Sequence, residues 1–291
     1  IMQMMKQLGY DLRPANPFEE GKEFASVILQ RSPYSIRIQL MWEKMRKQII
    51  KLTPPSTINV DIEKVLANMD ANYVKDSYHS LSIEGYRVTD ELIERVRSGE
   101  WDPKDLKQDS DSRNALAARG YYQAFQKVRE SVKSILLSSG KAGDIVADQL
   151  QNWHFELFEP CVQAAIIPAS DLVGYRKHQV YIRGSKHTPL NPDAIIDAMQ
   201  TFYTLLKQEE NVLVRSILGH FFFVYIHPYM DGNGRTARFI MNAMLVTVDY
   251  SWTIIPIEKR DEYMSTLETA SINGDIIPFA EFIYSLIGNV V

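Results

Sequence analysis

A short segment between two apolar stretches combines residue types that could bind a polyphosphate and move a proton beside it. It runs from His227 to Arg238 with the sequence HPYMDGNGRTAR. The ordinary pKa of a histidine such as His227 suits proton abstraction near neutral pH. Gly232 and Gly234, on either side of Asn233, permit positive φ and expose backbone N–H groups that could cradle an anion. The segment therefore predicts a phosphate-binding site with acid–base chemistry.

Three charged residues of the segment fit the same interpretation. Arg235 and Arg238 lie three positions apart, so on a helix they share one face, where both guanidinium groups could fork onto phosphate oxygens. Asp231 would repel a phosphate unless a cation lies between them, and Mg²⁺ is commonly held by one or two carboxylates plus substrate phosphates. Each feature alone is usually a helix end, a turn or a solvated face, but their joint occurrence favours a functional loop.

Two predicted helices position this loop. Residues 212–226 are almost wholly apolar and fit a buried helix, which should end at His227 because the residue before Pro228 disfavours helical dihedrals. After the turn, apolar residues recur at helical spacing at Ala237, Ile240, Met241, Met244, Leu245 and Val248. The glycine-rich turn is therefore expected at a helix N-terminus, where free N–H groups and the helix dipole favour an anion.

The loop resembles the signature of the Fic family, His-Pro-Phe-x-Asp/Glu-Gly-Asn-Gly-Arg-x-x-Arg. Tyr229 stands where phenylalanine is usual, a change that keeps the ring and adds a hydroxyl. Most Fic proteins transfer AMP from ATP to a hydroxyl of a target protein and release pyrophosphate. The resemblance implies this activity for the chain, and it implies an all-α helical bundle with a short β-hairpin flap as the fold.

The resemblance also implies a role for each residue of the loop. His227 would be the general base for the target hydroxyl, and Asp231 would hold Mg²⁺ on the α- and β-phosphates. Arg238 would orient the γ-phosphate, and the phosphates would be cradled by Gly232, Asn233, Gly234 and Arg235. Glycine at position 234 favours AMP transfer, because the kinase-like branch of the family carries lysine there. Tyr263, in a later helix, falls near where the family contacts adenine.

A second match to the family lies upstream, where Ser80 and Glu84 precede Gly85. The two residues are four apart and share a face of a predicted helix over about 60–85. They resemble the family's inhibitory motif, Ser/Thr-x-x-x-Glu-Gly/Asn, which implies that Glu84 pairs with Arg238 and leaves ATP bound unproductively. Some Fic proteins with such a helix also remove AMP, using the same glutamate to position water.

A third stretch, residues 174–189, has the pattern of a short β-hairpin. Alternating β-formers at Val180, Tyr181 and Ile182 precede a Gly-Ser turn at Gly184. Fic proteins carry a flap hairpin here, whose edge pairs with the backbone of the target protein. The resemblance therefore assigns Val180, Tyr181 and Ile182 to target docking.

Composition limits the remaining alternatives. The 291 residues carry a net charge of −4 and one cysteine, Cys161, so there is no basic footprint for nucleic acid and no intrachain disulfide. No stretch is long and apolar enough to span a membrane comfortably, and the start lacks a signal-peptide core. We therefore expect a cytoplasmic protein. The resemblance to the Fic family implies that it uses ATP and Mg²⁺ and modifies a Ser, Thr or Tyr hydroxyl of a target protein, the chain itself included.

The rest of the pattern predicts a mostly helical chain in two parts. Residues 1–110 form an N-terminal helical region that includes the inhibitory helix, and residues 111–291 form the core with the signature loop and the C-terminal helices. A first helix is expected at 17–30, and the polar segment 99–112 is the expected linker. Residues 1–60 match no family pattern and either pack on the core or help to form a homodimer.

Two alternative functions stay open at this point. The first is another phosphotransfer reaction of the same fold, such as kinase-like use of ATP or use of a different nucleotide. The second is a helical interaction module that binds a nucleotide without turnover. The presence of both His227 and Asp231 argues against the second, since such a module needs neither a base nor a metal ligand.

Overall fold

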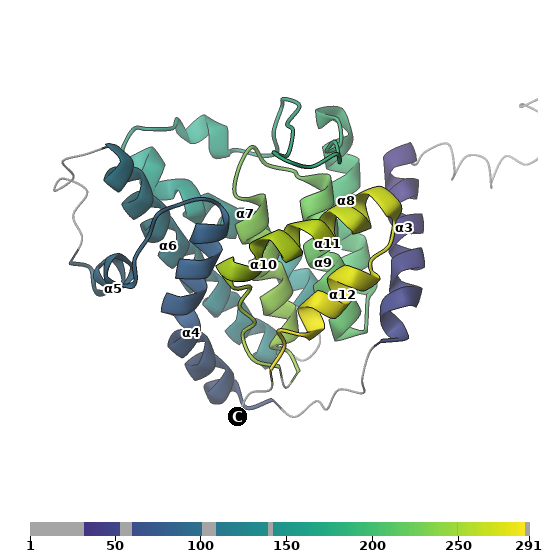
Figure 1. Cartoon of the computed structure of the whole chain (residues 1–291), viewed down its shortest axis with the longest axis horizontal. Helices are drawn as coiled ribbons and strands as arrows, with labels where there is room; N and C mark the ends of the chain where they lie inside the picture. Colours follow the sequence, from purple (N-terminus) through teal and green to yellow (C-terminus); the bar gives the residue numbers. More distant parts are fainter. Residues whose placement is uncertain (1–31, 53–59, 101–108, 139–141, 249, 289–291) are drawn as a thin grey trace, which may run out of the picture.

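The computed structural model describes residues 32–52, 60–100, 109–138, 142–248 and 250–288, and these residues form an all-α bundle without a β-strand (Figure 1). The predicted fold class is confirmed. The helices are α3 (Pro33–Ile50), α4 (Ile62–Ile83), α5 (Asp90–Ser98), α6 (Asp109–Leu137), α7 (Ala142–Gln163), α8 (Pro192–Gln208), α9 (Val212–Ile226), α10 (Asn233–Leu245), α11 (Arg260–Asn273) and α12 (Ile277–Tyr284), with 3-10 turns η2 (Ala169–Leu172) and η3 (Ile257–Lys259). Within those ranges, no helix combines the length and apolar character that a membrane span needs.

Helix α9 lies in the core of the bundle and leads directly into the signature loop. It packs against α10, α3 and α8, and nearly all of its side chains are buried. Burial on every side explains why this helix is apolar all round instead of along one stripe. The Asn211 side chain caps its start by accepting a hydrogen bond from Val214 N. The helix ends at His227, which adopts the left-handed conformation with φ 53°.

Helix α4, which carries the predicted inhibitory motif, packs against α6 and α5. Its N-terminus is capped by Asp61, and Arg129 of α6 forms two hydrogen bonds with Asp70. Most of the buried apolar side chains, from Ile38 in α3 to Ile283 in α12, belong to one hydrophobic cluster. The same core that holds α9 and α10 therefore also holds α4 beside them.

The helices predicted over about 60–85 and over 212–226 agree with α4 and α9 to within a few residues. The helix predicted over 17–30 lies outside the described residues, as does most of the linker predicted over 99–112. The described end of that linker is already helical, because α6 begins at Asp109. Aspartate and serine are common in loops but also suit the start of a helix, so composition alone does not separate the two.

Candidate active site

The signature loop is closed by the side chain of Asn233. Its amide Nδ2 donates to the carbonyl of Tyr229 at 2.9 Å, and its Oδ1 accepts from Tyr229 N at 3.0 Å. The turn also requires glycine at position 232, since φ is 83° and a Cβ would lie 2.8 Å from the ring of Phe158. The buried side chain of Asn233 therefore holds the turn together, and the place of Asn233 in the phosphate cradle stays a prediction.

The N-terminus of α10 faces a carboxylate in this structure. The first N–H groups of a helix have no partner within the helix, and no side-chain cap at Gly232 replaces one. Oε1 of Glu84 lies over Gly234, where any added Cβ would overlap it. The positive end of the helix dipole favours such a negative charge. Glu84 thus lies at the place where the sequence predicts a phosphate.

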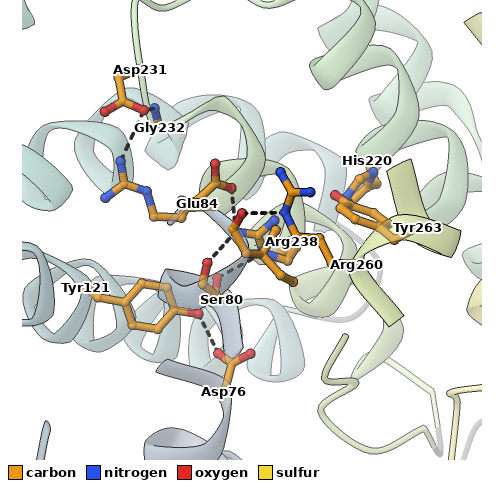
Figure 2. A network of polar contacts seen from close by, with 12 residues as sticks. Asp76, Ser80, Glu84, Tyr121, His220, Asp231, Gly232, Arg238, Arg260 and Tyr263 are labelled. Atoms are coloured by element: carbon orange, nitrogen blue, oxygen red, sulfur yellow. Dashed lines mark hydrogen bonds and ion pairs between the residues drawn. The ribbon is translucent and has the colours of Figure 1, made fainter. Parts of the chain in front are cut away.

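Arg238 is held by helix α4 through three contacts, drawn in Figure 2. Its Nε donates to Ser80 Oγ at 2.9 Å, while Nη2 donates to the Ser80 carbonyl at 3.0 Å and to Glu84 Oε1 at 2.8 Å. Burial opposes the charge of this guanidinium, but the Glu84 carboxylate outweighs it and raises the pKa of Arg238 above its usual value. The predicted ion pair between Glu84 and Arg238 is present.

Arg235 is fully buried, and two aromatic rings lie close to its guanidinium. Its Cζ lies 5.2 Å from the ring centroid of Tyr86 and 5.0 Å from that of Phe158, distances at which a cation is attracted to an aromatic face. Nη2 lies 3.4 Å from Asp231 Oδ1. Within the described part of the chain, neither Nε nor Nη2 has a hydrogen-bond acceptor. Buried donors without acceptors are costly, so they favour an anionic ligand at this position.

His227 presents one ring nitrogen to the site. Its Nδ1 lies 3.2 Å from the carbonyl of Val224, and a nitrogen facing a carbonyl must carry the proton. Nε2 of the neutral ring is then free to accept a proton. Burial lowers the pKa of His227 to about 4, so the ring is neutral at physiological pH. The backbone of the same turn is held by Arg176, whose Nε donates to the His227 carbonyl at 2.8 Å.

Asp231 lies at the mouth of the loop, with 55% of its side chain exposed. Its Oδ1 accepts from Gly232 N at 2.6 Å, and its carbonyl lies 2.9 Å from His154 Nε2. No group of three or more potential metal ligands occurs among the described residues. A single exposed carboxylate nevertheless fits Mg²⁺, which retains several waters and takes further ligands from substrate phosphates.

Comparison with known proteins identifies the domain that holds the signature loop. The model of the Fic/DOC family matches residues 144–245, which include the whole signature loop. Residues 144–245 therefore form a Fic/DOC domain. The protein named Protein adenylyltransferase Fic from Drosophila yakuba is 39% identical over 113 residues, which cover 38% of this chain and 22% of that protein. The Drosophila melanogaster protein of the same name gives the same figures, so the chain matches about a fifth of the length of these relatives.

Solved Fic structures share the fold. Fic-1 from C. elegans has a TM-score of 0.61 at 21% identity, covering 87% of this chain and 70% of that chain. A Fic family protein from Desulfovibrio desulfuricans G20 has a TM-score of 0.57 at 20% identity, covering 88% of this chain and 72% of that chain. At these identities the likeness establishes the arrangement of helices, which extends well beyond the segment matched by the family model.

Tyr263 does not occupy the adenine-facing position that its place after the Fic signature suggests. Only 1% of the residue is exposed, and its hydroxyl lies 2.9 Å from Nε2 of His220. Its ring packs close to Phe279 and Phe282 of α12. The polar hydroxyl on an otherwise apolar ring is satisfied inside the core beside His220 (Figure 2), and the buried ring offers no open face to a ligand.

The Fic flap forms a hairpin-shaped loop without the predicted strand pairing. The expected turn is present, because Ser185 N donates to the Ile182 carbonyl at 3.1 Å and Gly184 has φ 81°. Residues 174–191 nevertheless contain no strand. Side chains anchor the loop instead, including Glu268 of α11, which accepts from the Ser185 hydroxyl and from Lys186 N. Of the docking residues, Tyr181 is 78% exposed, while Val180 and Ile182 are partly buried.

Sequence reasoning missed several residues that shape the Fic site. Asp76 accepts a 2.6 Å hydrogen bond from Tyr121, and burial raises its pKa to about 6. It lies four residues before Ser80 on α4, so helical spacing could have identified it. The aromatic partners of Arg235 carry no such signal, because Tyr86 and Phe158 come from segments distant in the sequence.

Proposed function

We propose that this chain is a protein adenylyltransferase, which transfers AMP from ATP to a hydroxyl group of a target protein. The observation that carries the proposal is the convergence in one loop of a neutral His227, the N-terminus of α10 and two buried arginines. The relatives from Drosophila bear the name protein adenylyltransferase, which supports the same reaction for the shared domain.

The reaction would be an in-line displacement at the α-phosphorus of ATP. Nε2 of His227 takes the proton of the target hydroxyl, whose oxygen bonds to the α-phosphorus while the bond to the bridging oxygen of the β-phosphate breaks. Pyrophosphate leaves with that oxygen. The protein contributes mainly position and fixed positive charge, from the α10 N-terminus, Arg235 and Arg238. Mg²⁺ bound through Asp231 would neutralise charge on the phosphates.

We also propose that Glu84 inhibits the enzyme within the same chain. The carboxylate engages Arg238 and lies over Gly234, so it competes for two groups that the phosphates of ATP would use. Residues 1–110 would then be a regulatory region, because α4 brings Ser80 and Glu84 to the core. AMP removal by the same site, a homodimer and a cytoplasmic location stay predictions from the sequence.

The deciding experiment compares three proteins: the wild type, Glu84→Gly and Glu84→Gly/His227→Ala. Each is incubated with Mg²⁺, candidate target proteins, and ATP labelled at the α-phosphate or, in parallel, at the γ-phosphate. We expect protein-bound α-label that is weak in the wild type, strong in Glu84→Gly and absent without His227. ATP binding should persist in the double variant. Label from the γ-phosphate alone would make the enzyme kinase-like, and ATP binding without either label would favour a nucleotide-binding module.

A further inference from the structure

Arg176 is a buried cation that no carboxylate of the described residues neutralises. It is 5% exposed, and desolvation lowers its pKa. Its guanidinium instead donates to three backbone carbonyls. Nε bonds to His227 at 2.8 Å, Nη1 bonds to His178 at 2.8 Å, and Nη2 bonds to Leu190. Its own backbone N donates to the Pro228 carbonyl at 2.9 Å. Burying a charge in this way is costly, so the arrangement points to a specific task.

The geometry requires arginine and not merely a positive charge. A guanidinium has five N–H donors in a rigid planar fork, whereas the lysine ammonium is a compact point charge on a flexible stem. The three donors of an ammonium share one nitrogen, whereas the bonds of Arg176 leave from three separate nitrogens, Nε, Nη1 and Nη2. One of these carbonyls belongs to His227, the C-terminal cap of α9, where the negative end of the helix dipole also favours a cation.

The first carbonyl belongs to a residue in an unfavourable backbone conformation. His227 has φ 53° and is one of two non-glycine residues with positive φ in the described part of the chain. This left-handed conformation costs energy in a residue with a Cβ and persists only when its surroundings hold it. Arg176 binds the carbonyls of both His227 and Pro228, while Asn233 closes the following part of the loop through Tyr229. The turn is therefore held from both sides.

The other two carbonyls belong to the two arms of the flap. His178 begins the arm that leads to Tyr181, and Leu190 ends the arm that returns to α8. Because the arms are not paired as strands, these bonds set how the flap sits relative to the catalytic turn. We infer that Arg176 is a positioning residue. It holds His227 in its left-handed conformation, and it fixes the position of the flap relative to Nε2 of His227. This inference rests on the proposed function and on the target-docking role that the sequence predicts for the flap.

The kinetic test uses the Glu84→Gly protein as parent and adds Arg176→Lys or Arg176→Met. The matched control is Arg215→Lys, since Arg215 is also buried, donates to a backbone carbonyl (Glu209) at 3.1 Å and lies at the opposite end of α9. A base displaced by about 1 Å loses roughly 100-fold in rate. We expect kcat for α-label transfer to fall by that order in both Arg176 variants, with the KM for ATP unchanged. The control should lose thermal stability but keep kcat.

A kcat for Arg176→Lys close to that of the parent would overturn the inference. A second measurement does not depend on activity. In crystal structures of the two Arg176 variants, His227 should leave the region of positive φ and the flap should shift relative to the loop. A retained φ and flap position would also overturn it. If the Glu84→Gly parent transfers no label, the proposed function fails, while these structures still decide whether Arg176 anchors the turn.

Discussion

Replacing Glu84 by glutamine would separate two ways in which this side chain could block the site. Its carboxylate forms a 2.8 Å ion pair with Arg238, and the same oxygen lies over Gly234 at the start of α10. Glutamine keeps the size of the side chain and a hydrogen-bond acceptor but removes the charge. Alanine removes the charge, the acceptor and most of the side chain. Comparing the two variants therefore distinguishes the ion pair from simple occupancy of the site.

The size of the effect follows from the burial of the pair. The Arg238 side chain is 4% exposed and the Glu84 side chain 25%, so solvent screens the pair less than it screens a surface salt bridge. A hydrogen bond to a charged group contributes about 1.5–3 kcal/mol and a neutral one about 0.5–1.5 kcal/mol. The Glu84→Gln variant loses the difference, about 1–1.5 kcal/mol. The fraction of molecules in which Arg238 is free to bind ATP should therefore rise roughly tenfold. In Glu84→Ala, which loses the whole charged hydrogen bond, the same fraction should rise roughly 10- to 150-fold.

The assay measures the initial rate of α-label transfer at fixed ATP, together with the Kd for ATP by calorimetry. Glu63→Gln is the matched control, because Glu63 lies exposed in the first turn of the same helix. We expect the order wild type, Glu84→Gln, Glu84→Ala, with the control equal to the wild type. A glutamine variant as inactive as the wild type, beside an active alanine variant, would refute the ion-pair reasoning and leave occupancy over Gly234 as the block.

Two further predictions concern the metal and the base. Asp231→Asn, in the Glu84→Gly background, should raise the Mg²⁺ concentration for half-maximal transfer by at least roughly tenfold, because a carboxylate ligand is lost. An unchanged Mg²⁺ titration would remove Asp231 as a ligand. Only the neutral ring of His227 accepts a proton, and burial lowers the pKa of this ring to about 4. The rate of transfer should therefore stay level as the pH is lowered through 6.5, and it should fall only as the pH approaches 4. A pH–rate profile with its acidic midpoint near the ordinary histidine value of 6.5 would contradict this.

Helix boundaries were the most predictable part of the fold. The sequence predicts α9 with its observed bounds, since Pro228 marks the end of the helix at His227. The flap was less predictable, because alternating β-formers show that a strand could form but not whether a partner lies beside it. Here Arg176 and Glu268 provide bonds that a strand partner would otherwise supply.

The sequence by itself determined the chemistry of the loop, because a histidine, a carboxylate, two glycines and two arginines fall within twelve consecutive residues, His227 to Arg238. It also predicted, through the family resemblance, that Glu84 reaches Arg238. Only the tertiary structure decided that Asn233 closes the loop, that Arg235 lies over the rings of Tyr86 and Phe158, and that Arg176 joins the flap to the turn at His227. The contacts of Arg235 and Arg176 depend on which distant segments fold side by side, and the role of Asn233 depends on how the turn closes. The spacing of residues along the chain does not determine these contacts.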